Sequence, residues 1–293
     1  LRRSRGLGDV YKRQVLIRGI TSFSGTDPLV VIDGINSSLW DMDAINPNDI
    51  ESISVLKDAS TTAMYGVKGG SGVIVITTKS GKKNQETIFS LDTSYGVQEV
   101  DKYINVLNAS QYGAILNEGS VQSGGPIIFS DLSSAGVGTN WQKELFNAAP
   151  ISTTNFSASG GSDTSTYFLS VGYTAQEGVA VGGDKDFNDR ATLTANFTTD
   201  FSDKLKAIFH TKYSNIQGNG HGGNQIFNAL NFDPMIPVMV NGAYGISSTI
   251  TQEVINPLAG VSNSYSDNKT DKLIGKIELL SLIHISEPTR PSQ

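Results

Sequence analysis

Residues 87–97 read Thr-Ile-Phe-Ser-Leu-Asp-Thr-Ser-Tyr-Gly-Val, and apolar and polar side chains alternate along them. Phe89 and Leu91 belong to one set, and Ser90 and Asp92 belong to the other. Successive side chains of a β-strand point to opposite faces, so this pattern predicts a strand with one apolar face and one polar face. Such a strand separates an apolar environment from a wet one.

The same alternation returns in four later segments, namely residues 167–175, 191–197, 205–213 and 273–279. Short connections at 160–163 and 200–204 alternate with long ones at 99–150 and 217–270, while 176–188 is intermediate. A soluble β-sandwich also alternates apolar and polar residues. Alternating short turns and long loops favour a transmembrane β-barrel with a wet lumen. We therefore expect residues 84–280 to form the first antiparallel strands of a large transmembrane β-barrel with long extracellular loops.

Composition excludes some kinds of membrane segment and some kinds of binding site. The 293 residues carry a net charge of −6, no cysteine and three histidines. No apolar run approaches the roughly 18 residues of a membrane helix, so any membrane crossing has to use strands. His210 and His221 lie far apart in sequence without an acidic cluster, so we expect no metal site and no cofactor.

Both ends of the chain differ from the rest. Residues 1–14 hold five basic residues against one acidic residue, although the whole chain is acidic. Residues 281–293 interrupt an alternating strand and end in a proline-containing polar stretch. We expect both tails to be non-native and leave them out of the fold prediction. A basic targeting or nucleic-acid arm is the alternative for the first tail, but no apolar signal core follows it.

Residues 15–83 have a different pattern, which predicts a small α/β unit. An apolar strand at 29–32 ends at Asp33-Gly34, a dipeptide that favours a tight turn. A second strand follows at 50–57, and Asp58 can cap a short helix at 59–65 that ends at Gly66. Residues 73–78, Val-Ile-Val-Ile-Thr-Thr, predict a strand buried on both faces.

The glycine-rich stretch at 68–72, Lys-Gly-Gly-Ser-Gly, invites comparison with a phosphate-binding loop. A phosphate loop leaves a strand and enters a helix, with its lysine late and next to Ser or Thr. This stretch leaves the predicted helix and enters a strand, so the order is wrong. We expect a steric role, in which the backbone comes too close to a neighbour for a side chain to fit.

Several motifs in one frame resemble the plug signature of SusC/RagA-type TonB-dependent outer-membrane importers. They are Ile-Arg-Gly at 17–19, Pro-Leu-Val-Val-Ile-Asp-Gly at 28–34, Ile-Asn-Pro-Asn-Asp-Ile-Glu-Ser-Ile at 45–53, Val-Leu-Lys-Asp-Ala-Ser at 55–60, Ala-Met-Tyr-Gly at 63–66 and Gly-Val-Ile-Val-Ile-Thr-Thr-Lys at 72–79. Further motifs at 139–141, 156–161, 167–173 and 176–178 extend the resemblance to about Gly218. The family's N-terminal extension, its TonB box and the first part of its plug are not seen here.

The resemblance implies a mainly β fold: the C-terminal part of a plug domain at 15–83, then the barrel strands at 84–280. The plug residues with structural and gating roles would be Arg18, Gly19, Asp33, Gly34, Lys57, Asp58, Tyr65, Gly66 and Gly72. It implies no catalytic residue and leaves the substrate-binding residues unknown. Trp141 and Tyr112 are expected to be packing anchors rather than substrate contacts.

The resemblance also implies a place and partners. The protein would lie in outer-membrane lipid of a bacterium and work with TonB and its inner-membrane energising complex. A SusD-like lipoprotein would form a lid, the cargo would be an oligosaccharide or a peptide, and no nucleic acid would be bound.

A secreted or surface β-rich enzyme acting on glycosides is the alternative from another class. It would need two carboxylates at a fixed separation across a cleft, for which Glu51 with Asp58 or Glu177 with Asp184 could be proposed. Nothing in their sequence setting distinguishes these four from solvated surface charges. A purely adhesive surface protein would predict repeats, and the sequence contains none.

Overall fold

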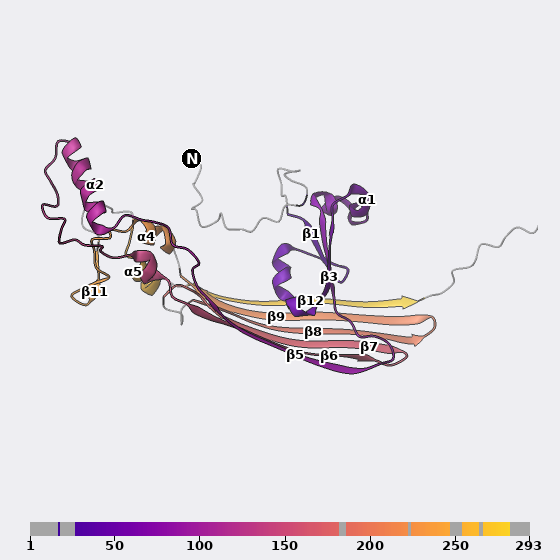
Figure 1. Ribbon diagram of the computed structural model, residues 1–293. Coiled ribbons are helices and arrows are strands. Elements are labelled where there is room, and N and C mark those ends of the chain that lie inside the picture. The colour runs from indigo at the N-terminus through magenta and orange to yellow at the C-terminus, as the bar shows by residue number, and fades with distance from the viewer. Residues whose placement is uncertain are drawn as a thin grey trace, which may run out of the picture.

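The computed structural model describes residues 17, 27–181, 186–221, 224–246, 254–263 and 266–281. These residues form a small unit (residues 27–83), a large curved sheet, and a group of helices beyond one end of that sheet (Figure 1). The first tail, residues 282–293 of the second tail, Arg18 and Gly19 lie outside the described residues. Ser281, which was predicted to belong to the second tail, pairs with Leu205 as the last residue of a strand. The described residues include no helix that is long and apolar enough to cross a membrane.

The small unit contains a four-stranded sheet in the order β2-β1-β4-β3. Its strands are β1 (Leu29–Ile32), β2 (Ile35–Ser37), β3 (Ile50–Leu56) and β4 (Val73–Thr78). β1 and β4 are parallel, whereas the two outer pairs are antiparallel. Asp33 and Gly34 both have positive φ, at 48° and 83°, as the two-residue hairpin between β1 and β2 requires. The predicted tight turn is confirmed.

Short helices connect these strands: η2 (Leu39–Ala44), η3 (Pro47–Asp49), α1 (Ala59–Thr62) and η4 (Ala63–Ser71). The α-helix predicted at 59–65 is shorter than expected, because it tightens into a 3-10 helix after Thr62. Gly66 has the positive φ predicted for it, but the 3-10 turns continue beyond it to Ser71. The backbone oxygen of Asp58 accepts hydrogen bonds from the Thr62 amide and the Thr61 hydroxyl at the start of α1.

The predicted steric role of the glycine-rich stretch is confirmed at two of its glycines. A Cβ on Gly69 would lie 2.7 Å from the backbone oxygen of Thr62, and one on Gly72 would lie 2.7 Å from the Ile17 side chain. Gly70 has open space around it. The stretch therefore packs tightly at its two ends.

An apolar core holds the small unit together. Its buried members are Val30, Ile32, Ile45, Ile74 and Ile76. Strand β4 lies between β1 and β3, and its valines and isoleucines are buried apart from a half-buried Val75. The prediction of a strand covered on both faces is confirmed.

The large sheet has six antiparallel strands in the order β12-β9-β8-β7-β6-β5. They are β5 (Gln85–Gln98), β6 (Ala149–Gly161), β7 (Ser165–Glu177), β8 (Phe187–Ser202), β9 (Leu205–Gly220) and β12 (Ser266–Ser281). β8 and β9 pair from Phe187 with Asn219 to Ser202 with Leu205, with one irregularity near Asp200. The small unit stands on one face of this sheet, here called the inner face (Figure 1).

The two faces of the large sheet have opposite chemistry. Buried residues on the inner face are mostly polar, such as Asn155, Ser170, Thr194, Asn196 and Lys212. The outer face exposes apolar side chains, of which Phe89, Leu91, Val171, Leu193, Leu273 and Ile277 are examples. This is the arrangement that the alternating sequence pattern predicts for a barrel wall with lipid outside and a wet lumen inside.

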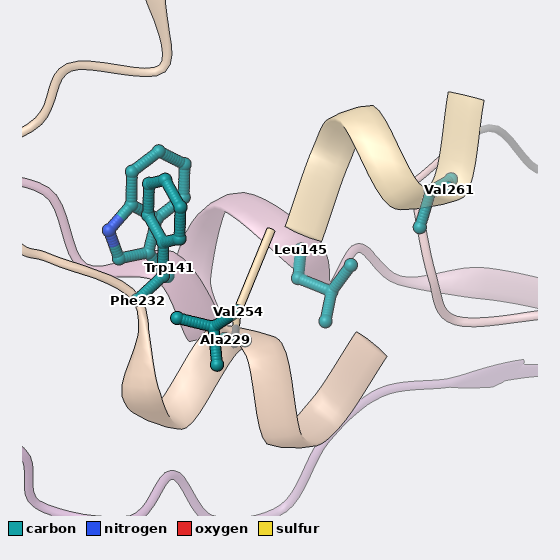
Figure 2. Close-up of a cluster of buried hydrophobic side chains, with 6 residues drawn as sticks. All are labelled: Trp141, Leu145, Ala229, Phe232, Val254 and Val261. Atoms are coloured by element: carbon teal, nitrogen blue, oxygen red, sulfur yellow. The ribbon is translucent and has the colours of Figure 1, made fainter. Parts of the chain in front are cut away.

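The long connections fold into an outer module rather than remaining irregular. It contains α2 (Ala109–Gln122), α3 (Trp141–Leu145), α4 (Gln225–Asn231), α5 (Pro257–Asn263) and the short strands β10 (Met239–Val240) and β11 (Ala243–Tyr244). Trp141, Leu145, Ala229, Phe232, Val254 and Val261 form its core (Figure 2).

Trp141 anchors this module. Its ring meets Phe232 edge-on at a centroid distance of 4.9 Å, and its indole N–H donates to the backbone oxygen of Asp233. The side chain is buried, so the predicted role as a packing anchor is confirmed. Tyr112 is only half-buried and lines a hollow beside Trp141.

Candidate functional site

The contact between the small unit and the inner face is the candidate site. At its centre the Asn46 side chain, from the turn before η3, donates to Asn155 Oδ1 on β6 at 2.7 Å. The same Asn155 oxygen accepts from Ser170 on β7 at 3.0 Å. All three residues are buried, so hydrogen bonds between side chains replace water at this point.

Three further contacts continue the interface along β8. Thr194 donates to Asp49 Oδ2 at 2.6 Å. Asn196 donates to Thr78 Oγ1 at 2.9 Å and to the backbone oxygen of Lys79 at 2.8 Å. One oxygen of Asp49 and the amide oxygen of Asn196 are buried without a hydrogen-bond partner among the described residues. This interface is polar, but some of its groups are incompletely paired.

Asp33 is the charged centre of the contact. Its carboxylate accepts from the backbone N–H of Thr78 at 2.8 Å and from the Thr78 hydroxyl at 2.7 Å. The Lys212 ammonium of β9 donates to the same carboxylate, and both side chains of this ion pair are almost fully buried. His210 Nδ1 lies 3.6 Å from Asp33 Oδ2, which is longer than a hydrogen bond.

The surroundings of Asp33 shift the pKa of its carboxyl group in opposite directions. Burial by itself raises the pKa of this carboxyl group. The close approach of His210, the charge and hydrogen bond of Lys212 and the hydrogen bond from Thr78 outweigh burial, so the pKa lies well below its usual range. The carboxylate is therefore charged at neutral pH, where it accepts the hydrogen bond of Lys212.

Glycine on the inner face lets the two units approach closely. A Cβ at Gly172 on β7 would lie 2.1 Å from the amide nitrogen of Asn46 and 2.7 Å from Thr192 Oγ1. Near the short turns, a Cβ at Gly81 would meet backbone oxygens of Gly160 and Tyr167 at 2.2 and 2.4 Å. Side chains at either position would push the small unit away from the sheet.

Strand β12 completes the contact on the other side of the small unit. Lys272 donates to the backbone oxygen of Trp40 in η2, and Ile274 packs against the apolar core of the small unit. Lys83 forms an ion pair with Asp200 at the short-turn end of β8. The small unit is thus held by residues of five of the six strands, from β6 to β12.

Only some of the residues predicted from the motifs lie at this interface. Asp33 is at its centre, and a Cβ on Gly34 would lie 3.4 Å from the Lys276 ammonium of β12. The other predicted residues that the structure describes lie in or next to the α1 and η4 region, and their surroundings differ. They are Lys57, Asp58 and Gly66, which are exposed, Tyr65, which is half-buried, and Gly72, which packs on Ile17.

Sequence reasoning missed Asn46, Asp49, Thr78 and their partners on the sheet as interface residues. The sequence did contain a signal for an interface. The polar side chains on one face of each alternating strand had to face either water or another unit. Asn46 and Asp49 belong to the motif at 45–53, but the presence of these residue types there is already accounted for by a turn. Which polar residues meet depends on how the two units dock.

The carboxylates considered for an enzyme are exposed wherever the structure describes them. Glu51 is exposed on β3 and Asp58 is exposed before α1. Glu177 is exposed at the end of β7, and Asp184 lies outside the described residues. Among the residues that the structure places, no group of three or more His, Cys, Asp or Glu is arranged to hold a metal ion.

Comparisons with known proteins agree on one family. Residues 5–73 match the family described as the TonB-dependent Receptor Plug Domain. The chain is 34% identical to TonB-dependent receptor P3 of Formosa agariphila over 88% of its own length and 25% of that receptor. It is 35% identical to TonB-dependent receptor SusC of Bacteroides thetaiotaomicron, over 85% of the chain and 25% of SusC.

Solved structures give the same result for the fold. The RagAB peptide importer in its open-open state matches at 28% identity with a TM-score of 0.56, over 66% of this chain and 25% of that chain. Another RagAB structure reaches a TM-score of 0.70 at 23% identity, over 88% of this chain and 33% of that chain, and shows a shared fold. The chain spans about a quarter of the length of the two curated relatives it matches.

Proposed function

The chain belongs to the SusC/RagA type of TonB-dependent receptors of the bacterial outer membrane, and from this premise we propose that its parent protein imports a large nutrient past a movable plug. The observation that supports this most directly is the polar contact between the small unit and the inner face of the large sheet. The small unit would be part of the plug, and the six strands would be the start of the barrel wall.

The chemistry of the contact suits a plug that leaves and returns. Asn46, Asp49 and Thr78 bind the wall through side-chain hydrogen bonds. Water can replace such bonds when the units separate, so the net free energy of each bond is only about 0.5–1.5 kcal/mol. A continuous apolar contact would instead expose a large apolar area during every transport cycle. The apolar core of the plug lies within the small unit, where it keeps the unit folded.

The predicted motif residues would act as parts of this plug. Asp33 would anchor it through Lys212, and Gly34 would let the hairpin approach β12. We propose structural or gating roles for Arg18, Gly19, Lys57, Asp58, Tyr65, Gly66 and Gly72 as well. The plug would extend over residues 15–83 and the barrel segment over residues 84–280.

The partners follow from the same premise. TonB and its inner-membrane energising complex would supply the work, because a hydrogen-bonding lumen can solvate a cargo but cannot bias its movement inward. A SusD-like lipoprotein would cover the outer module as a lid. The cargo would be a glycan or a peptide; the matched RagAB structures are of a peptide importer. The parent protein would carry out no covalent chemistry, since the relatives are receptors by name.

An uptake assay with the intact parent protein tests the proposal. Uptake should stop in a TonB-deletion strain and in a strain lacking the parent gene, whereas cargo binding at the cell surface should persist without TonB. Uptake that continues without TonB would refute energised import. Cargo that is chemically altered by the purified protein would support the enzyme instead.

A disulfide tether tests the movement of the plug itself. Asp49 and Thr194 touch across the interface at 2.6 Å, and the described chain has no free cysteine to interfere. The double variant Asp49→Cys/Thr194→Cys should bind cargo but fail to import it when oxidised, and a reducing agent should restore import. Each single cysteine variant is the matched control. Normal import with the disulfide formed would show that this part of the plug does not move.

A further inference from the structure

Several buried polar atoms at the contact between the small unit and strands β8 and β9 lack a hydrogen-bond partner among the described residues. They are Asp49 Oδ1, Asn196 Oδ1, His210 Nδ1 and Ser214 Oγ. A histidine ring and a serine hydroxyl can each donate or accept, whereas a carboxylate oxygen and an amide oxygen only accept. Asp49 and Asn196 therefore present two buried acceptors that need a donor or a cation.

The orientation of the Asn196 amide is fixed by its neighbours. The Thr78 hydroxyl donates its hydrogen to Asp33 Oδ2, so the Thr78 oxygen accepts from the Asn196 amide nitrogen. The backbone oxygen of Lys79 accepts from the same nitrogen. Exchanging the nitrogen and oxygen of this amide would break both bonds, so the unpaired atom is the oxygen.

Asp49 and Asn196 meet at one residue of the small unit. The backbone N–H of Lys79 donates to the backbone oxygen of Asp49 at 2.8 Å, and the backbone oxygen of Lys79 accepts from Asn196 at 2.8 Å. Asp49 is 1% exposed and Asn196 is 3% exposed. One unpaired oxygen thus belongs to the small unit and the other to the sheet, on the two sides of the same contact.

The buried charges at this contact do not balance. Asp33 and Lys212, with side chains 4% and 1% exposed, neutralise each other. Asp49 is buried as deeply, and the ion pairs within the described part of the chain do not include it. A buried carboxylate is costly unless it is paired or binds a metal ion. The contact is therefore short of one positive charge.

Charge and ligand type together limit what completes the contact. A water molecule can donate to both oxygens, but it leaves the negative charge of Asp49 uncompensated. A calcium ion needs about six to eight oxygen ligands and brings one charge too many. A monovalent metal ion supplies the missing charge and suits carboxylate and amide oxygens, and the packed surroundings favour a small one.

We propose that Asp49 Oδ1 and Asn196 Oδ1 bind one sodium ion between the plug and the barrel wall. A metal site is not expected from the scattered histidines, but this one uses oxygen ligands instead. Because its two ligands belong to different units, the ion binds the docked state and stabilises it. Sodium therefore favours the closed plug, and the ion is lost when the units separate. This inference rests on the proposed plug function and adds a means of regulating it.

Thermal unfolding of the purified intact parent receptor in detergent tests the site. The salts are sodium chloride, potassium chloride and choline chloride at equal ionic strength and pH. The unfolding midpoint of the wild type should rise with sodium concentration and then level off. It should rise less in potassium chloride and stay constant in choline chloride. Hydrogen exchange should show that sodium protects residues 45–56, the part of the plug at the contact.

Two variants separate the site from general effects of charge. Asp49→Asn keeps the shape but removes the charge, so the sodium concentration for the half-maximal shift should rise by about tenfold or more. In choline chloride this variant should be at least as stable as the wild type, because it no longer buries an uncompensated charge. A loss of folding cannot imitate that result. Glu51→Gln removes an exposed carboxylate nearby on β3 and should respond to sodium as the wild type does.

Equal midpoints in sodium chloride and choline chloride would overturn the proposal and leave water as the occupant. A sodium response that survives in Asp49→Asn, or that Glu51→Gln removes as well, would also overturn it. If the response is absent while uptake still depends on TonB, the ion site is wrong and the import function stands. If the response is present and uptake does not need TonB, the ion site stands and the import function has failed.

Discussion

The two sheets of this protein bury residues of opposite polarity. In the small sheet the buried residues are apolar, with Val30, Ile32 and Ile76 inaccessible to solvent. In the large sheet the most buried residues are polar, with Thr194 and Lys212 at 1% and Ser214 at 0% exposure, while Leu193 between its polar neighbours is 41% exposed. Both sheets have the same kind of backbone hydrogen bonding, but one buries apolar side chains and the other buries polar ones.

The two regions are stabilised by different interactions of their buried residues. The small unit excludes water from an apolar core, so its stability comes mainly from the hydrophobic effect. The large sheet exposes its apolar side chains on the outer face and buries polar ones against the small unit. Its inner face is stabilised by hydrogen bonds and by the buried ion pair of Lys212 with Asp33, which the small unit completes. Removing a polar side chain from the inner face should therefore lower the free energy of unfolding. The loss should be comparable to that caused by removing an apolar side chain from the core of the small unit.

The largest effect is expected from removing one member of the buried ion pair. Lys212→Met leaves Asp33 charged and without its ammonium partner, which costs about 3–5 kcal/mol for a buried pair. Chemical unfolding of the intact receptor in detergent, followed by tryptophan fluorescence, measures this loss. The double variant Asp33→Asn/Lys212→Met should regain most of it. A single variant as stable as the wild type would show that the pair does not hold the units together.

The pH dependence of the same pair sharpens this test. Because the pKa of Asp33 is lowered in the folded protein, the pair stabilises it fully at neutral pH. This contribution begins to be lost as the pH falls below the ordinary carboxyl pKa of about 4, and it disappears below the lowered pKa. Unfolding midpoints of the wild type and Asp33→Asn should therefore converge on acidification. Two midpoints that separate further in acid would contradict the assignment of the charged group.

The outer face should respond to charge in the opposite way to the inner face. Leu193 lies near the middle of β8 on the outer face, which the proposed barrel turns toward lipid, so Leu193→Arg should cost about 2–4 kcal/mol. Unfolding of the receptor reconstituted in lipid vesicles measures this cost, with Leu193→Ala as the matched control for lost packing. An arginine that is tolerated as well as alanine would mean that this face is not in lipid.

A smaller effect is expected from one neutral hydrogen-bond donor. Thr194→Val keeps the shape of the side chain but removes the donor to Asp49, whose other oxygen is already unpaired. Leaving this buried carboxylate unsatisfied costs about 1–3 kcal/mol. Thr198→Val, at a half-buried position on the same strand, should be near neutral. Equal losses in the two variants, measured by unfolding in detergent, would show that the Asp49 contact contributes nothing specific.

Much of the fold could be predicted from local patterns. Period-two alternation identified five of the six strands of the large sheet, at 87–97, 167–175, 191–197, 205–213 and 273–279. β6 was represented only by the motif at 156–161, because its alternation is weak. The hairpin at Asp33-Gly34 and the buried strand β4 were also predicted, since turn chemistry and a run of Val and Ile act within a few residues.

The outer module was predicted less well. The stretches at 99–150 and 217–270 are expected to be long loops, and the structure folds parts of them into four helices, of which α3, α4 and α5 share a core. α3 and α4 supply Trp141 and Ala229 to that core from segments about 90 residues apart. Helices this short gain most of their stability from tertiary packing, so their own sequences carry only a weak signal.

By itself, the sequence determined which side chains share a face and where the chain turns, because these properties follow from the two-residue repeat of a strand and from the chemistry of single turn residues. Only the tertiary structure decided which polar residues pair across the interface. Asp33 meets Lys212 across 179 positions and Asn46 meets Asn155 across 109, and no local pattern links either pair. Those partners depend on the strand register and on the docking of one folded unit against another, and both are set by the whole arrangement of the chain.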